Sequence, residues 1–114
     1  MANKRDALME KYAFHIQDKF GETPDNEFLY KVTVGLGPSI YNRDSATVSS
    51  SDESELERVK NNFLIKKLGM SDSPELMETI HKVMSVYGAS VRTKYRAVVY
   101  YMLAKHFKKE GIYS

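Results

Sequence analysis

The residues best suited to do chemistry in this chain form one polar segment, Asn42 to Ser51. It reads Asn-Arg-Asp-Ser-Ala-Thr-Val-Ser-Ser-Ser and has no apolar periodicity, and its Asn, Asp and Ser residues favour local turns. Arg43 could bind a carboxylate or phosphate through two parallel hydrogen bonds, with Asp44 and Ser45 orienting it. In the alternative, which we favour, Asp44 and Ser45 bond to the backbone of their own loop and Arg43 pairs locally. The small-ligand hypothesis requires a pocket beside this loop with converging polar groups.

A second candidate is the strongly basic C-terminal segment. Residues 80–114 hold seven Lys and Arg against one Glu, a net +6, whereas residues 1–79 carry a net −4. Such an asymmetry indicates a polyanion or an acidic partner. If a recognition helix follows the Gly88-Ala-Ser90 turn, its basic side chains could reach guanine or phosphate in a major groove. The nucleic-acid-binding hypothesis uses Arg92, Lys94, Arg96, Lys105, Lys108 and Lys109.

The same segment is strongly apolar in its middle, from Ala97 to Ala104. A recognition helix must expose one face, and an apolar stretch of this kind is more typical of a helix buried on several sides. The overall charge of +2 is also low for a nucleic-acid-binding domain. We therefore favour a central core helix whose two solvated ends carry the basic residues.

The remaining residue patterns predict no catalytic, metal or cofactor site. His15, His81 and His106 lie at the edges of apolar stripes, where boundary histidines are common. Glu78 and His81 have the i, i+3 spacing of helical di-iron sites, but such sites need two copies of this motif plus two further glutamates. The carboxylates of residues 52–57 are best explained as favourable charge at a helix N-terminus. No cysteine is present, which excludes thiolate chemistry and disulfides.

Apolar residues recur at helical spacing in five stretches, each bounded by helix start and stop signals. Only residues 32–34 have β-branched character, and they are too few to argue for a sheet. The sequence therefore predicts an all-α fold, a compact five-helix bundle with the C-terminal helix at its centre. The predicted helices run from Asn3 to Phe20, from Thr23 to about Leu36, from Ser51 to Gly69, from Ser73 to Gly88, and from Ser90 to just before Gly111.

Length and composition are those of one globular domain. The 114 residues are 42% hydrophobic and 28% charged, which suffices for a single hydrophobic core without disulfides or a structural metal. The longest apolar run has eight residues, too few to span a bilayer, and charges interrupt the N-terminus. We expect one domain over residues 1–114 that is soluble, cytoplasmic and not bound to a membrane.

Several sequence blocks and their spacing resemble a known family. The blocks are Asn42-Arg-Asp-Ser45, Val48, Ser51-Asp52, Glu55-Leu56, Val59, Phe63-Leu64, Lys66-Lys-Leu-Gly69 and Tyr100-Tyr-x-Leu-Ala104. They resemble the small bacterial proteins catalogued as domain of unknown function 2853, over roughly residues 25–108. The resemblance implies a compact helical domain, and it brings no known activity, cofactor or catalytic residue.

Three functional hypotheses follow from the residues. The leading one is a non-enzymatic helical protein that acts through a protein partner or by self-association, which requires an exposed apolar or aromatic patch. The second is nucleic-acid binding by the basic residues named above, with an affinity that falls steeply with salt. The third is binding of a small ligand by Arg43, Asp44 and Ser45.

Overall fold

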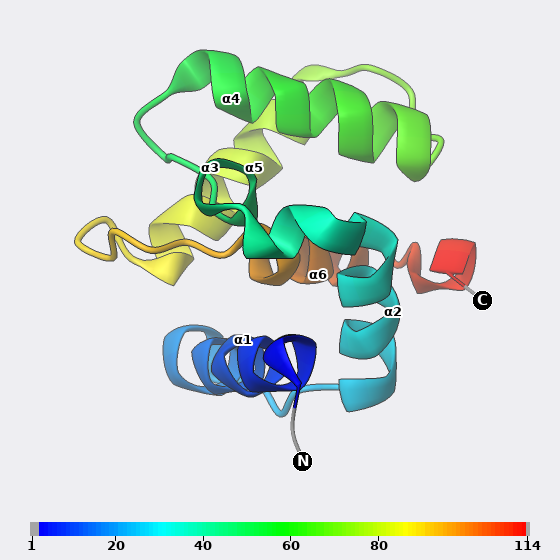
Figure 1. Cartoon of the computed structure of the whole chain (residues 1–114). Coiled ribbons are helices and arrows are strands. Elements are labelled where there is room, and N and C mark those ends of the chain that lie inside the picture. The colour runs from blue at the N-terminus through cyan, green and yellow to red at the C-terminus, as the bar shows by residue number, and fades with distance from the viewer. Residues whose placement is uncertain (1–2, 114) are drawn as a thin grey trace.

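The computed structural model describes residues 3–113, apart from the side chain of Arg43. Figure 1 shows helices throughout, and the longest connection between them is formed by residues 88–95. The chain order is α1 (Lys4–Phe20), α2 (Asn26–Leu36), the 3-10 helix η1 (Gly37–Tyr41), α3 (Arg43–Ala46), α4 (Glu53–Arg58), the π-helix η2 (Val59–Lys67), α5 (Pro74–Tyr87), α6 (Arg96–His106) and the 3-10 helix η3 (Glu110–Tyr113).

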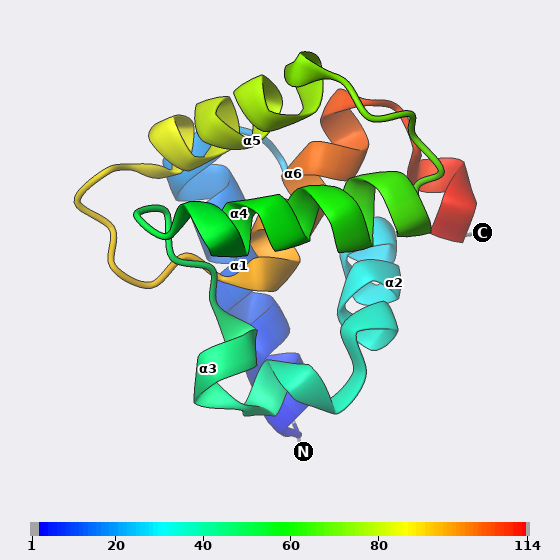
Figure 2. The same cartoon turned by 90° about the horizontal axis from the view of Figure 1, so that it is seen from above.

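The predicted all-α fold is confirmed. The described residues contain no strand, and two of them, Thr47 and Tyr95, form an isolated antiparallel bridge. α4 continues directly into η2, so the two form one long rod in Figure 2. The rod begins where Asp52 accepts hydrogen bonds from the backbone N–H groups of Ser54 and Glu55, as helix N-caps do. Within the part of the chain that the structure describes, no helix has both the length and the apolar character needed to cross a membrane.

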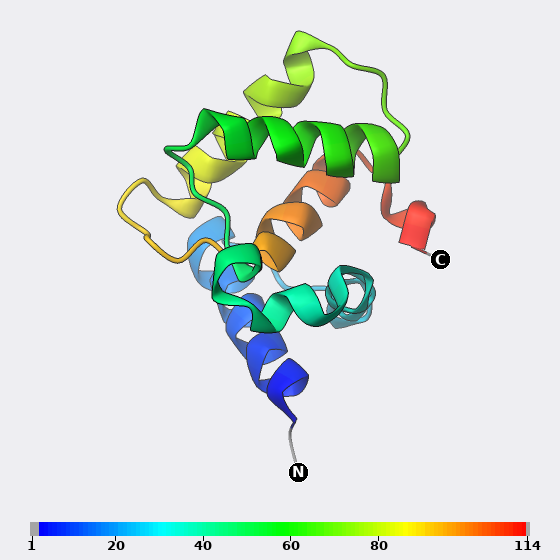
Figure 3. The same ribbon diagram turned by 45° about the horizontal axis from the view of Figure 1, so that its top comes forward.

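Helix α6 occupies the centre of the bundle. It contacts α1, α2, α3 and α5, and Figures 1 and 3 show it enclosed between α1 and the α4–η2 rod. On the side of the rod, the ring of Phe63 stacks on that of Tyr100 with centroids 3.9 Å apart. Most of the helix is therefore core, as its all-round apolar character requires. Its buried residues are Ala97, Val98, Val99, Tyr101, Met102, Leu103 and Ala104.

The prediction that this last helix begins at Ser90 was wrong. The helix begins at Arg96, and Tyr95 before it has an extended backbone, with φ −64° and ψ 131°. The cause is tertiary: the backbone N–H of Val48 donates to the carbonyl of Lys94 over 2.8 Å, and Thr47 and Tyr95 form the bridge. Pairing with a distant segment therefore holds these residues extended against the local helix signal.

The structure corrects two further boundaries. The segment expected to be wholly irregular contains the one-turn helix α3, which Asn42 caps by accepting from the N–H of Asp44 at 3.0 Å. The last helix ends at His106 rather than near Gly111, because Lys108 adopts the left-handed conformation at φ 57°. A residue in this conformation ends a helix, as glycine more often does.

Candidate functional site

Two loops on one side of the molecule enclose a polar pocket. The loop before α4 and the loop before α6 lie on the same side in Figures 1 and 2, and the Thr47–Tyr95 bridge joins them at their base. The hollow between them has a volume of about 560 Å³, within the range of small-molecule sites. Its walls come from Asp44, residues 47–51 and Glu55 on one side and from the Ala89–Lys94 loop on the other. We call it the inter-loop pocket.

Arg96 fixes the wall formed by residues 44–55. Its Nε donates to the carbonyl of Ser45 at 2.7 Å, and one terminal nitrogen donates to the carbonyl of Thr47 at 3.3 Å. The same nitrogen lies 2.9 Å from a carboxylate oxygen of Glu55, and both side chains are only 17% exposed. The other terminal nitrogen donates to the hydroxyl of Tyr100 at 3.3 Å. A guanidinium used in this way positions the loop and has little capacity left for a ligand.

Lys94 places a covered cation in the wall of the inter-loop pocket. The residue is only 3% exposed, and its ammonium donates to the carbonyl of Val91. No carboxylate of the described residues lies within 4 Å of this ammonium. Burial lowers the pKa of Lys94 below its ordinary value, because a covered ammonium loses solvation that no counter-ion replaces. A buried lysine without a carboxylate is a site where an anion can bind.

The opposite wall supplies hydroxyl groups. Ser49 and Ser51 lie with their side-chain oxygens 3.2 Å apart, and Ser50 and Thr47 are residues of the same lining. A hydroxyl both donates and accepts, so these side chains can bind an oxyanion or a hydroxylated ligand. Arg92, on the Lys94 side, is exposed and can add a second cation. The pocket thus combines cations on one loop with hydroxyls on the other.

The three residues of the predicted small-ligand site have different surroundings. Asp44 lines the inter-loop pocket and is exposed. The hydroxyl of Ser45 donates to the carbonyl of Ser39 in η1 at 2.9 Å and lies 3.5 Å from the carbonyl of Asn42 within its own loop. The Arg43 side chain lies outside the described residues. Of the two whose side chains the structure describes, Asp44 lines the pocket and Ser45 is not among the lining residues.

The six basic residues of the nucleic-acid hypothesis are also separated. Arg92 and Lys94 belong to the inter-loop pocket, and Arg96 lies behind its wall. Lys105 is at the far end of α6, where its ammonium lies 3.3 Å from Asp25 and 3.8 Å from Glu110. Beyond the helix, Lys108 is exposed and Lys109 is half-buried.

The other ionisable residues considered in the sequence lie elsewhere. His81 is 3.1 Å from a carboxylate oxygen of Glu53, on the neighbouring rod, rather than facing a second His and Glu pair. His15 bonds to the hydroxyl of Tyr87 in the core. Among the residues that the structure describes, no group of three His, Cys, Asp or Glu side chains is close enough to hold a metal ion.

The sequence analysis did not predict that Lys94 lines a pocket. Lys94 was assigned to a helix exposed for nucleic acid, but it lies before the helix and is covered. Its sequence neighbours Thr93 and Tyr95 gave no signal of burial, because the backbone pairing that places this loop joins segments nearly fifty residues apart. The serines of residues 49–51 were visible as a polar run, but no pattern in the sequence paired that run with Lys94.

The fold and the pocket define a small all-helical protein with a polar site between two loops. The chain belongs to the family described as protein of unknown function (DUF2853), whose model matches residues 11–111. No curated protein matches the chain.

Proposed function

We propose that this protein binds a small hydroxylated anion, bearing a carboxylate or a phosphate, in the inter-loop pocket. The observation that carries the proposal is Lys94, a covered cation that has no carboxylate partner among the described residues and lines a pocket of ligand size. An anion beside its ammonium would replace the solvation that burial removes. Arg92 would add a second positive charge, and the serine hydroxyls would bind further oxygens of the ligand.

The carboxylates in the pocket restrict the ligand. Glu55 is neutralised by Arg96, so it adds little repulsion. Asp44 remains at the rim and can accept hydrogen bonds from hydroxyl groups of the ligand. A ligand with one anionic end and several hydroxyls fits both features, whereas a bare apolar molecule fits neither. The proposal names a binding protein and assigns no catalytic residue.

The test is a titration of the ¹⁵N-labelled protein with inorganic phosphate, glucose 6-phosphate and glucose. Binding is measured through the NMR chemical shifts of the backbone amides. We expect both phosphates to shift residues 47–51 and 89–94, with the sugar phosphate binding more tightly. The Lys94→Met variant should weaken binding roughly tenfold or more, the loss expected for one charge-assisted hydrogen bond. Lys66→Met removes an exposed lysine outside the pocket and is the matched control. Equal affinity for glucose and its phosphate, or no effect of Lys94→Met, would contradict the proposal.

A second candidate function is association with a protein partner or with a second copy of the chain. It is favoured by large apolar side chains that are exposed on α1, α2 and η1: Phe14 at 63%, Tyr30 at 46%, Val34 at 46% and Tyr41 at 52%. Tyr41 and Ile40 line two adjoining shallow hollows that extend to α1 and α2. Exposed patches of this kind are common at interfaces. If the chain self-associates here, Tyr41→Glu should shift a dimer towards monomer in light scattering, and a wild-type monomer at high concentration excludes the self-association.

Nucleic-acid binding has less support than these two proposals. A duplex reader needs several free cations on one face, whereas Lys94 is covered and Arg96 and Lys105 form ion pairs. Anisotropy titrations with duplex DNA and RNA at low salt test it directly, and tight binding that falls steeply with salt would restore it. For the setting of all these activities we propose the cytoplasm of a bacterium, as expected from the sequence.

A further inference from the structure

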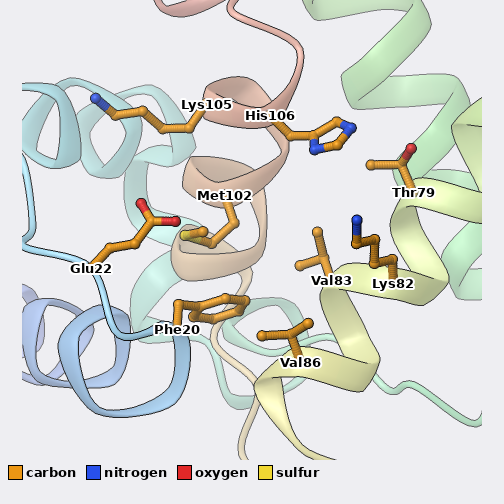
Figure 4. Close-up of a pocket in the computed structure, with 9 residues that line it drawn as sticks. All are labelled: Phe20, Glu22, Thr79, Lys82, Val83, Val86, Met102, Lys105 and His106. Carbon is orange, nitrogen blue, oxygen red and sulfur yellow. The ribbon is translucent and has the colours of Figure 1, made fainter.

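A second hollow lies between α5, α6 and the end of α1, on residues that the proposed function does not use. Its volume is about 380 Å³, and Figure 4 shows the side chains around it. We call it the α5–α6 hollow. Its apolar surface comes from Phe20, Val83, Val86 and Met102.

The apolar part of the hollow is open to a ligand. Val86 is 49% exposed, whereas its neighbours on the same helix, Val83 and Tyr87, are buried. Phe20 is held in place by an edge contact with Tyr87, at 5.3 Å between ring centroids. In Figure 4, Phe20, Val83 and Val86 converge on the lower part of the hollow. This surface fits a chain of methylene groups, whose transfer from water is favourable by about 0.8 kcal/mol per buried CH₂.

Charged groups stand on opposite sides of that apolar surface. Figure 4 shows His106 and Lys82 on the side of α5 and α6, and Glu22 across the hollow. No carboxylate of the described residues lies within 4 Å of the Lys82 ammonium. The remaining charged residue of the lining, Lys105, points away from the centre of the hollow and pairs with Asp25. A carboxylate is therefore attracted at the Lys82 side and repelled at the Glu22 side, which fixes the direction of a bound molecule.

We propose that the α5–α6 hollow is a binding site for a small carboxylate with an apolar tail. The carboxylate lies between Lys82 and His106, and the tail lies on Phe20, Val83 and Val86. Lys82 supplies a cation, the imidazole of His106 donates a hydrogen bond, and Glu22 excludes the reversed orientation. This site shares no lining residue with the inter-loop pocket, so either proposal can fail without the other.

The experiment uses octanoate as the probe, with octan-1-ol and octylamine as probes of the same tail and a different head. Each is titrated into the full-length ¹⁵N-labelled protein below its aggregation concentration. We expect octanoate to bind most tightly, with amide shifts in α5 and α6. Lys82→Glu should weaken octanoate roughly fivefold or more, the effect expected for reversing a partly solvated charge next to the ligand. Lys66→Glu, a charge reversal of another exposed lysine, should leave its affinity unchanged.

A second variant tests the apolar surface. Val86→Asp should abolish binding of octanoate and of octan-1-ol, and because Val86 is half-exposed the protein should keep its fold, as circular dichroism would verify. Lys94→Met should have no effect on octanoate. The proposal is overturned by equal affinity for the three probes, by shifts confined to other elements, by equal effects of Lys82→Glu and Lys66→Glu, or by no binding of octanoate at millimolar concentration.

Discussion

Replacing Tyr12 with phenylalanine removes one oxygen atom from the core and is expected to stabilise the protein. Tyr12 is completely buried, and its ring packs edge-on against Tyr95 with centroids 5.0 Å apart. Its hydroxyl has no hydrogen-bond partner among the described residues. Burial, together with the nearby tyrosines Tyr95 and Tyr41, raises the pKa of Tyr12 to about 12. The ring contributes apolar contacts that phenylalanine keeps, whereas the oxygen contributes only a desolvation cost.

Tyr87 provides the matched comparison, because it is equally buried but its hydroxyl is bonded. Its oxygen accepts from the backbone N–H of Tyr95 at 3.2 Å, and the hydroxyl also forms a hydrogen bond with Nδ1 of His15. An unpaired buried polar group costs about 1–3 kcal/mol, and removing one partner of a buried bond costs a similar amount. Tyr12→Phe should therefore raise the free energy of unfolding by about 1–3 kcal/mol, and Tyr87→Phe should lower it by about as much.

Urea unfolding followed by circular dichroism at pH 7 measures both changes. Alkaline pH gives an independent check, because the pKa of Tyr12 is raised in the folded protein, so the unfolded chain loses this proton first. The wild type should therefore lose stability as the pH rises from 10 towards 12. Tyr12→Phe should therefore lose less stability than the wild type between pH 10 and pH 12. A Tyr12→Phe variant that is destabilised as much as Tyr87→Phe would refute the reasoning.

Two further predictions concern Arg96, which fixes the loop, and the half-buried histidine His15. Arg96→Met should lower the free energy of unfolding by about 3–5 kcal/mol, since it leaves the half-buried Glu55 without its partner. Arg96→Lys should recover only part of this loss in the same urea assay, because a compact ammonium cannot reproduce the planar fork of donors of a guanidinium. Burial, with a contribution from Lys19, lowers the pKa of His15, so an NMR titration should place its midpoint below 6.5. Stability should then fall as the pH drops below 6.5, because the unfolded chain takes up that proton first, and His15→Gln should remove this dependence; a His15 midpoint above 6.5 would contradict the prediction.

Most of the fold could be predicted because its signals are local. Asn3 and Asp52 cap helices through bonds that span three residues or fewer, and Gly21 ends α1 with φ 68°. The all-round apolar character of residues 97–104 correctly placed α6 at the centre. The start of α6 could not be predicted, because Ser90 is an acceptable cap locally and only the pairing of Lys94 with Val48 excludes a helix there.

Only one wall of the inter-loop pocket could be predicted from the sequence. The polar run of residues 42–51 marked one wall, because such runs form loops whatever their surroundings. Lys94 and Lys105 carry the same side chain in the same basic segment, yet one is covered without a carboxylate and the other is paired with Asp25. Contacts between residues far apart in the sequence decide which of these lysines is covered and which forms an ion pair. A single sequence does not contain that information in any local pattern.

The most direct test of the inter-loop pocket is the titration of the Lys94 ammonium itself, followed by NMR of the labelled lysine side chain. In the free protein its pKa should lie below 10.5, because burial disfavours the charge. Saturating phosphate or glucose 6-phosphate should move that pKa upward, since an anion bound beside the ammonium favours its charged form, while Lys66 stays unchanged. A Lys94 pKa that is the same with and without phosphate would contradict the proposed binding site.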